Sequence, residues 1–148
     1  MKNNQTIKEN FDFALENHKK NNLEVAEELY KKILEVYPNH FPSTVLLGTL
    51  SAQTKNFDLA KQLLKKAIKI NPNHPEAHYN LGNCYRDFGD FQKAINCYEQ
   101  ATKYQPGNLA YFYSLSILKK EILNPNLRNC EETFTGKIKK SLKKLTST

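Results

Sequence analysis

The stretch Pro75–Asn108, PEAHYNLGNCYRDFGDFQKAINCYEQATKYQPGN, contains two helical patterns and the turn between them. Pro75 and Glu76 suit a first helical turn, because proline needs no amide partner there and a carboxylate favours the positive helix end. Gly89 and Asp90 suit the turn, glycine as a left-handed stop and aspartate as the cap of the next helix. Apolar and small residues recur at helical spacing on both sides of it: Ala77, Leu81, Cys84, Tyr85, Phe88, and then Phe91, Ala94, Ile95, Tyr98 and Ala101. The stretch therefore predicts a helical hairpin.

The same pattern recurs with a period of 34 residues. Pro38, Pro72 and Pro106 mark the ends of three successive units. Other columns keep their residue type in this register: Ala26, Ala60, Ala94; Phe13, Leu47, Leu81, Leu115; and Ala14, Gly48, Gly82, Ser116. A fixed period of this size indicates a stack of repeats, and roughly four units fit into the 148 residues.

Each column has an expected structural purpose. The small residues let two antiparallel helices approach closely, and the large apolar residues fill the space between successive hairpins. Asn21-Asn22 and Lys55-Asn56 take the place of Gly89-Asp90 in the earlier units. We expect the left-handed conformation at all three turns, where asparagine is tolerated and lysine costs about 1 kcal/mol.

These units resemble a known repeat family. The third unit has His78-x2-Leu81-Gly82-x2-Tyr85, then Ala94-x3-Tyr98 and Pro106. The second has Leu47-Gly48, Ala60-x3-Leu64 and Pro72, and the first has Phe13-Ala14, Ala26-x3-Tyr30 and Pro38. The pattern resembles the tetratricopeptide repeat over about residues 7–121. The resemblance implies an all-α fold, a right-handed α-solenoid of helical hairpins with a capping helix at its C-terminal end.

The repeat register divides the chain. We expect a disordered leader at 1–6, repeats at 7–40, 41–74 and 75–108, and the first helix of a partial fourth repeat at 109–123. Asn124-Pro125 then breaks the pattern. Residues 124–148 are expected to form a basic amphipathic capping helix and tail, with an apolar stripe of Leu127, Cys130, Phe134, Ile138, Leu142 and Leu145.

Composition narrows the function classes. The sequence has no apolar run of about 18 residues and no apolar signal core, and its three cysteines lack Cys-x-x-Cys spacing. A cytoplasmic protein with reduced thiols is therefore expected. The net charge of +7 comes mostly from lysine and is uneven: residues 41–74 carry about +4 and residues 109–148 about +5, the latter in a lysine-rich C-terminal segment. That lysine-rich segment is expected to be a solvated face, and contact with nucleic acid or an anionic membrane is the alternative.

Catalytic and metal chemistry find no support in the sequence. His74 and His78 have ligand-like spacing, but Pro75 lies between them and no closed set of Cys and His accompanies them. We expect His74 in a turn and His78 against a helical neighbour. Cys84 and Cys97 fall on packed faces, where inert buried thiols are expected. We predict a protein that is not an enzyme and has no metal, cofactor or small-molecule substrate.

The resemblance also implies a binding face, because the first helices of such hairpins line a concave groove. An apolar strip is expected there, formed by Phe11, Leu15, Val45, Tyr79, Tyr113 and Ile117. The expected peptide-binding residues are Phe11, Leu15, Tyr79, Asn80, Asn83, Arg86, Tyr113 and Ile117. An apolar strip with a polar rim suits an extended or helical peptide, so the hypothesis is a scaffold or adaptor whose partner is a protein or peptide. The alternative for the strip is that the chain's own C-terminal helix covers part of it.

Two recognition modes of the family are disfavoured, and one other role stays open. A clamp for a C-terminal carboxylate would need lysine, asparagine and arginine in the groove, and the corresponding columns do not supply that set. An asparagine ladder would need asparagine throughout the column Asp12, Leu46, Asn80, Ser114, where only Asn80 fits. The competing hypothesis is a free-standing or truncated substrate-recruiting arm of a glycosyltransferase or sulfotransferase.

Overall fold

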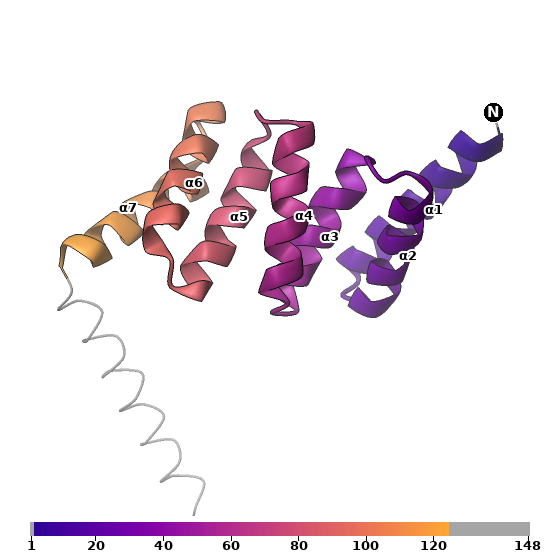
Figure 1. Cartoon of the computed structure of the whole chain (residues 1–148), viewed down its shortest axis with the longest axis horizontal. Helices are drawn as coiled ribbons and strands as arrows, with labels where there is room; N and C mark the ends of the chain where they lie inside the picture. The colour runs from indigo at the N-terminus through magenta and orange to yellow at the C-terminus, as the bar shows by residue number, and fades with distance from the viewer. Residues whose placement is uncertain (1, 125–148) are drawn as a thin grey trace, which may run out of the picture.

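The computed structural model describes residues 2–124, which form seven α-helices (Figure 1). The helices are α1 (Lys2–Lys19), α2 (Leu23–Val36), α3 (Phe41–Gln53), α4 (Phe57–Ile70), α5 (Pro75–Phe88), α6 (Phe91–Tyr104) and α7 (Leu109–Leu123). Each helix packs on the next, so the described part of the chain is a single row of hairpins. The expected all-α solenoid is confirmed.

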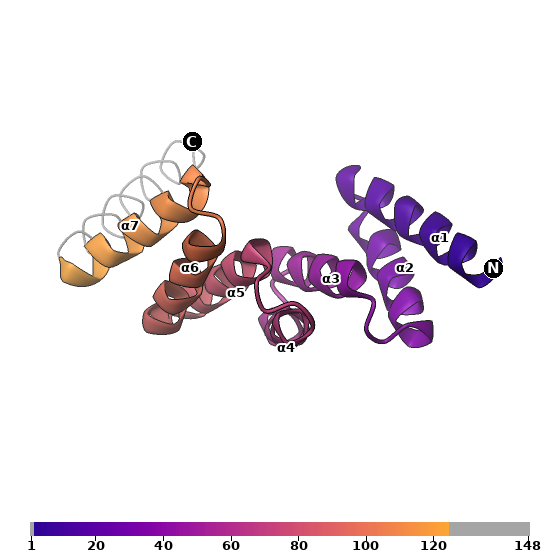
Figure 2. The ribbon, with the colours of Figure 1, turned by 90° about the horizontal axis from the view of Figure 1, so that it is seen from above.

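The row of helices bends into an arc. Figure 2 shows α1, α3, α5 and α7 along the inner side of this arc and α2, α4 and α6 along its outer side. The first helix of each hairpin therefore faces inward. The expected binding residues all come from three of these inner helices, α1, α5 and α7.

The turns inside the three hairpins share one backbone conformation. Asn21, Lys55 and Gly89 have φ values of 63°, 64° and 89°, and they lie 34 residues apart. Left-handed backbone at these positions confirms the expected turn register. The residue that follows caps the next helix in two of the turns, where Asn56 accepts from the Leu59 amide and Asp90 from the Lys93 amide, each at 3.4 Å.

The small-residue columns are where the two helices of a hairpin approach most closely. A methyl group added to Gly82 would lie 2.7 Å from Cε1 of Tyr98, and one added to Gly48 would lie 2.9 Å from Cγ of Leu64. Tyr98 and Leu64 are fully buried, as is Tyr30 in the same column of the first hairpin. The period therefore sets the packing: a large side chain of the second helix covers a small residue of the first.

The N-terminal end of the chain differs from expectation in two ways. Helix α1 begins at Lys2, so residues 2–6 are helical and not a disordered leader. These residues include neither proline nor glycine, and nothing in them stops the helix from extending. Phe13 is 54% exposed, whereas Leu47, one period later, is 3% exposed. The difference arises because the described chain places no hairpin before α1 to cover Phe13.

Helix α7 exposes apolar side chains that a repeat would normally cover. Leu109, Phe112 and Tyr113 are all mostly exposed, and α7 is the last described helix. The expected capping helix at 124–148 lies outside the described residues except for Asn124, and it stays a prediction. Within the described residues, no helix is long and apolar enough to cross a membrane.

Replacing Lys55 with glycine should stabilise the protein. Lysine pays a steric cost for its positive φ that glycine does not, so the free energy of unfolding should rise by about 0.5–1 kcal/mol. Asn21→Gly is the matched control, and its free energy of unfolding should rise by less, because asparagine tolerates this conformation. Urea unfolding measures both, and no gain for Lys55→Gly would contradict the assigned turn.

Replacing Gly82 with alanine should destabilise the protein, although alanine normally favours a helix by about 1 kcal/mol. The new methyl group would collide with the Tyr98 ring and lie 3.2 Å from Cβ of Cys97. We expect a net loss of about 1–2 kcal/mol in the free energy of unfolding, since overpacking usually costs about 1–3 kcal/mol. A thermal melt unchanged or raised in Gly82→Ala would show that the two helices are not in close contact here.

Stability should fall at high pH. Burial raises the pKa of the Cys84 and Cys97 thiols from 9.0 to about 11, and that of the Tyr30 and Tyr98 hydroxyls from 10.0 to about 12. Above its ordinary pKa each group ionises in the unfolded chain but stays protonated in the folded one. The stability that these groups contribute is therefore complete below pH 9 and is lost as pH rises toward 12. Urea unfolding from pH 7 to 12 should show this decline, and a flat profile between pH 9 and 11 would contradict it.

Candidate functional site

The expected binding residues form two separate groups on the inner side. Phe11 and Leu15 lie on α1, whereas Tyr79, Asn80, Asn83 and Arg86 lie on α5 and Tyr113 and Ile117 on α7. Ring and hydroxyl contacts join α5 directly to α7: Tyr79 lies 4.6 Å from Tyr111 between ring centroids, and its hydroxyl lies 3.2 Å from Oγ of Ser114. These contacts of Tyr79 hold α5 against α7, the helix that carries Tyr113 and Ile117.

The apolar strip is interrupted at α3. Val45 was expected to join Phe11 and Leu15 to Tyr79, but it is only 4% exposed and packs with Ala67 and Ala77. This expectation is wrong because the two alanines leave room for the valine side chain inside the stack. Phe11 is itself half-buried, with its ring 6.1 Å from that of Tyr30 and 5.4 Å from that of His40.

Tyrosine side chains from three helices meet at the C-terminal half of the stack. The ring of Tyr79 lies between Tyr111 and Tyr98, which is 5.5 Å away. The Tyr98 hydroxyl donates to Oδ1 of Asn83 at 2.7 Å. We call Tyr79, Tyr98 and Tyr111 the tyrosine cluster. Tyr79 and Asn83 therefore both hold this cluster together.

Asn80 also links neighbouring units. Its Nδ2 donates to Oγ1 of Thr49 at 2.8 Å, and Thr49 donates in turn to the carbonyl of Val45. No hydrogen bond to the other side-chain atom, Oδ1, occurs within the described residues. Asn80 therefore ties α5 to α3 through its amide nitrogen.

Three of the expected binding residues on α5 and α7 are exposed to solvent: Arg86, Tyr113 and Ile117. Tyr113 is 67% exposed and Ile117 is 36% exposed, so both present apolar surface. Arg86 is exposed as well, and its guanidinium contacts Oδ1 of the neighbouring Asp87 at 2.8 Å. An exposed pair of this kind is weak and can open to a ligand.

His74 and His78 have structural hydrogen-bond partners, and Cys84 and Cys97 are buried free thiols. His74 caps α5 by accepting from the Ala77 amide at 3.3 Å, and Nε2 of His78 lies 2.7 Å from the carbonyl oxygen of Pro72. The raised pKa values of Cys84 and Cys97 keep both thiols protonated at neutral pH, so they are poor nucleophiles. Within the described residues, no three His, Cys, Asp or Glu side chains are grouped to hold a metal ion.

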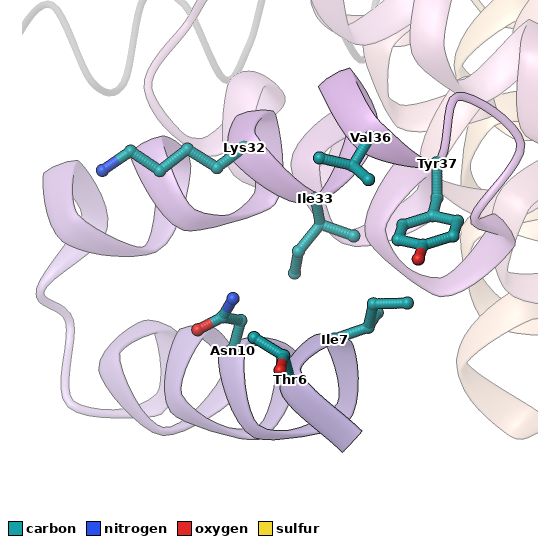
Figure 3. A pocket seen from close by; sticks show the side chains of 7 residues that line it. All are labelled: Thr6, Ile7, Asn10, Lys32, Ile33, Val36 and Tyr37. Carbon is teal, nitrogen blue, oxygen red and sulfur yellow. The ribbon is translucent and has the colours of Figure 1, made fainter. Parts of the chain in front are cut away.

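Sequence reasoning did not anticipate a pocket of about 280 Å³ between α1 and α2 (Figure 3). Its lining residues are Thr6, Ile7, Asn10, Lys32, Ile33, Val36 and Tyr37. Figure 3 shows Thr6, Ile7 and Asn10 on one helix, facing Ile33 on the other. The pocket is slightly smaller than typical ligand sites. No periodic pattern could predict it, because it depends on how far the two helices diverge.

Solved structures with a similar fold include several repeat domains. An O-GlcNAc transferase mutant from Thermobaculum terrenum is 25% identical with a TM-score of 0.76, over 80% of this chain and only 23% of the transferase chain. The first repeat domain of Spaghetti (RPAP3) bound to the HSP90 peptide SRMEEVD is 16% identical with a TM-score of 0.77, over 81% of this chain and 95% of its own. MamA from Desulfovibrio magneticus RS-1 is 21% identical with a TM-score of 0.74, over 88% of this chain and 72% of the MamA chain.

These similarities show the fold and not the partner, because the named proteins differ in role and identity is low. No curated protein matches the sequence as a relative. Two family models, both described as tetratricopeptide repeat, match residues 11–75 and 51–116 and together span residues 11–116. The motif resemblance, the hairpin geometry and both models agree, so the chain belongs to the tetratricopeptide repeat family.

Proposed function

We propose that the chain is a non-catalytic adaptor that binds a peptide or protein segment on the inner side of α5 and α7. Tetratricopeptide repeat stacks are protein-interaction scaffolds, and this chain has their architecture. The observation that carries the proposal is the exposed apolar surface of Tyr113 and Ile117 on α7, a helix that Tyr79 of α5 contacts directly.

The chemistry of this face suits a peptide. Tyr113 and Ile117 offer contact for an apolar side chain, and Oδ1 of Asn80 offers an acceptor for a peptide amide. Arg86 can pair with a carboxylate once its weak contact with Asp87 opens. The tyrosine cluster holds α5 and α7 in a fixed relation, which reduces the entropy lost on binding.

Phe11 and Leu15 belong to a separate part of the same proposal. They lie on α1, at the far end of the arc from α7 (Figure 2), and the buried Val45 interrupts the strip between them. An extended ligand that runs along the whole inner side would reach them, whereas a short peptide on α5 and α7 would not.

The second candidate is a substrate-recruiting arm of a glycosyltransferase or sulfotransferase, either free-standing or truncated. The observation that favours it is the fold similarity to the O-GlcNAc transferase chain, of which this chain matches 23%. Asn80 is the only asparagine in the ladder column, and its amide already bonds to Thr49. A catalytic reading frame directly downstream in the genome would support this role, and its absence would favour the adaptor.

The adaptor proposal predicts a selective loss of binding in Tyr113→Ser and Ile117→Ser. Because both side chains are exposed, the variants should fold normally but bind about tenfold more weakly or worse. The probe is a dodecapeptide selected from a random display library against the full chain, and its affinity is measured by fluorescence polarisation.

Val25→Ser is the matched control, since Val25 is an exposed apolar residue on the outer helix α2. It should leave the affinity unchanged. Equal binding by Tyr113→Ser, Ile117→Ser and the unmodified chain would place the binding surface elsewhere and contradict the proposal.

A further inference from the structure

A second polar and aromatic surface lies on the other side of the stack. Helix α4, the end of α5 and the start of α6 enclose a pocket of about 560 Å³ around the turn at Gly89. Three lysines and two aromatic rings line it: Lys61, Lys65, Lys93, Tyr85 and Phe88. We call this set the lysine–aromatic cluster. It lies between two outer helices, α4 and α6, and shares no residue with the inner face of α5 and α7.

The lysines converge on the faces of the rings. Nζ of Lys61 lies 4.2 Å from the centroid of Phe88, and the ammonium groups of Lys65 and Lys93 lie 5.9 and 5.5 Å from the centroid of Tyr85. These distances are within the range of cation–π attraction. The rings therefore hold three positive charges over one small pocket.

Tyr85 belongs to the repeat motif and packs against two core clusters, whereas repeat packing does not require Phe88 or the lysines. One period earlier, Ser51 and Thr54 stand at the places of Tyr85 and Phe88, and Glu27 stands at the place of Lys61. Those three residues build the same type of junction between α2 and α3 without rings or excess positive charge. Phe88, Lys61 and Lys93 are therefore specific to this junction, since Thr54, Glu27 and Leu59 occupy their places one period earlier.

The cluster also has one unneutralised charge. Asp58 contacts Lys61 at 3.1 Å and Asp90 contacts Lys93 at 2.5 Å, so the three lysines and two carboxylates of the pocket sum to +1. Within the described residues Lys65 makes no ion pair. Phe88, which also lines the pocket, is 66% exposed although Lys61 lies over its ring. A lysine without an ion pair and a partly exposed aromatic ring thus line the same pocket.

We propose that the lysine–aromatic cluster binds an acidic peptide segment, whose carboxylate pairs with Lys65 while an adjacent apolar side chain packs on Phe88. Charge complementarity selects this ligand. With Asp58 and Asp90 paired to Lys61 and Lys93, the pocket keeps one positive charge, which matches a single carboxylate. One unpaired lysine cannot neutralise the row of closely spaced phosphates that a nucleic acid presents. The chain then has two independent interaction surfaces, one on each side of the stack.

The test is nuclear magnetic resonance titration of the full ¹⁵N-labelled chain with a capped peptide, Gly-Ser-Asp-Asp-Leu-Phe-Gly-Ser. Saturable amide shifts should be confined to residues 58–65 and 85–93. Peptides with Asn-Asn in place of Asp-Asp, or Ser-Ser in place of Leu-Phe, should bind at least about fivefold more weakly, because each lacks one of the two contacts.

Variants of the chain separate this pocket from the rest of the surface. Lys65→Gln should weaken binding about fivefold and Phe88→Ser about tenfold. Lys31→Gln, at the equivalent position one period earlier, is the matched control and should change nothing. Tyr113→Ser should also have no effect, which distinguishes this proposal from the adaptor face.

Four outcomes would overturn the proposal. The first three are the lack of a saturable shift at millimolar peptide, shifts elsewhere on the chain, and equal affinity in Lys65→Gln. Tighter binding of a single-stranded thymidine oligonucleotide at the same residues would also overturn it, in favour of a polyanion site. Circular dichroism of each variant confirms that the fold is intact, so a loss of binding cannot be attributed to unfolding.

Discussion

The close approach of two helices at a small residue is the constraint on which the rest of this structure depends. Gly82 lies against the Tyr98 ring, and Gly48 lies against Leu64, because no larger residue fits there. This contact fixes the angle and spacing of each hairpin. Repetition of the contact every 34 residues then produces the arc, and the arc assigns first helices to the inner side and second helices to the outer side.

The same packing residues also shape the surfaces available for binding. Tyr98 covers Gly82 with its ring, bonds Asn83 through its hydroxyl and packs against Tyr79, which in turn contacts Tyr111 of the next unit. The proposed binding face is therefore an extension of the core and not a set of independent side chains. Its exposed members, Tyr113 and Ile117, are the ones whose removal separates binding from folding.

The sequence predicted the features that depend on one repeat at a time. The left-handed turn at Lys55 and the paired small and large columns follow from periodicity and local chemistry. Features that depend on two or more units were not predictable in this way. Val45 is buried in the stack because Ala67 and Ala77, which pack against it, are small. Tyr79 is half-buried because the Tyr111 ring of the next unit packs against its ring. Phe88 and Lys61 of the lysine–aromatic cluster differ from Thr54 and Glu27 one period earlier, but only the fold brings α4, α5 and α6 together there.

The most direct measurement of the central claim is a crystal structure of the full chain with a bound library-selected peptide. The account predicts that the peptide lies along the inner side of α5 and α7, in contact with Tyr113 and Ile117, while Tyr79 keeps its ring contact with Tyr111. A peptide bound across α2, α4 and α6, with the α5 and α7 face empty, would contradict it.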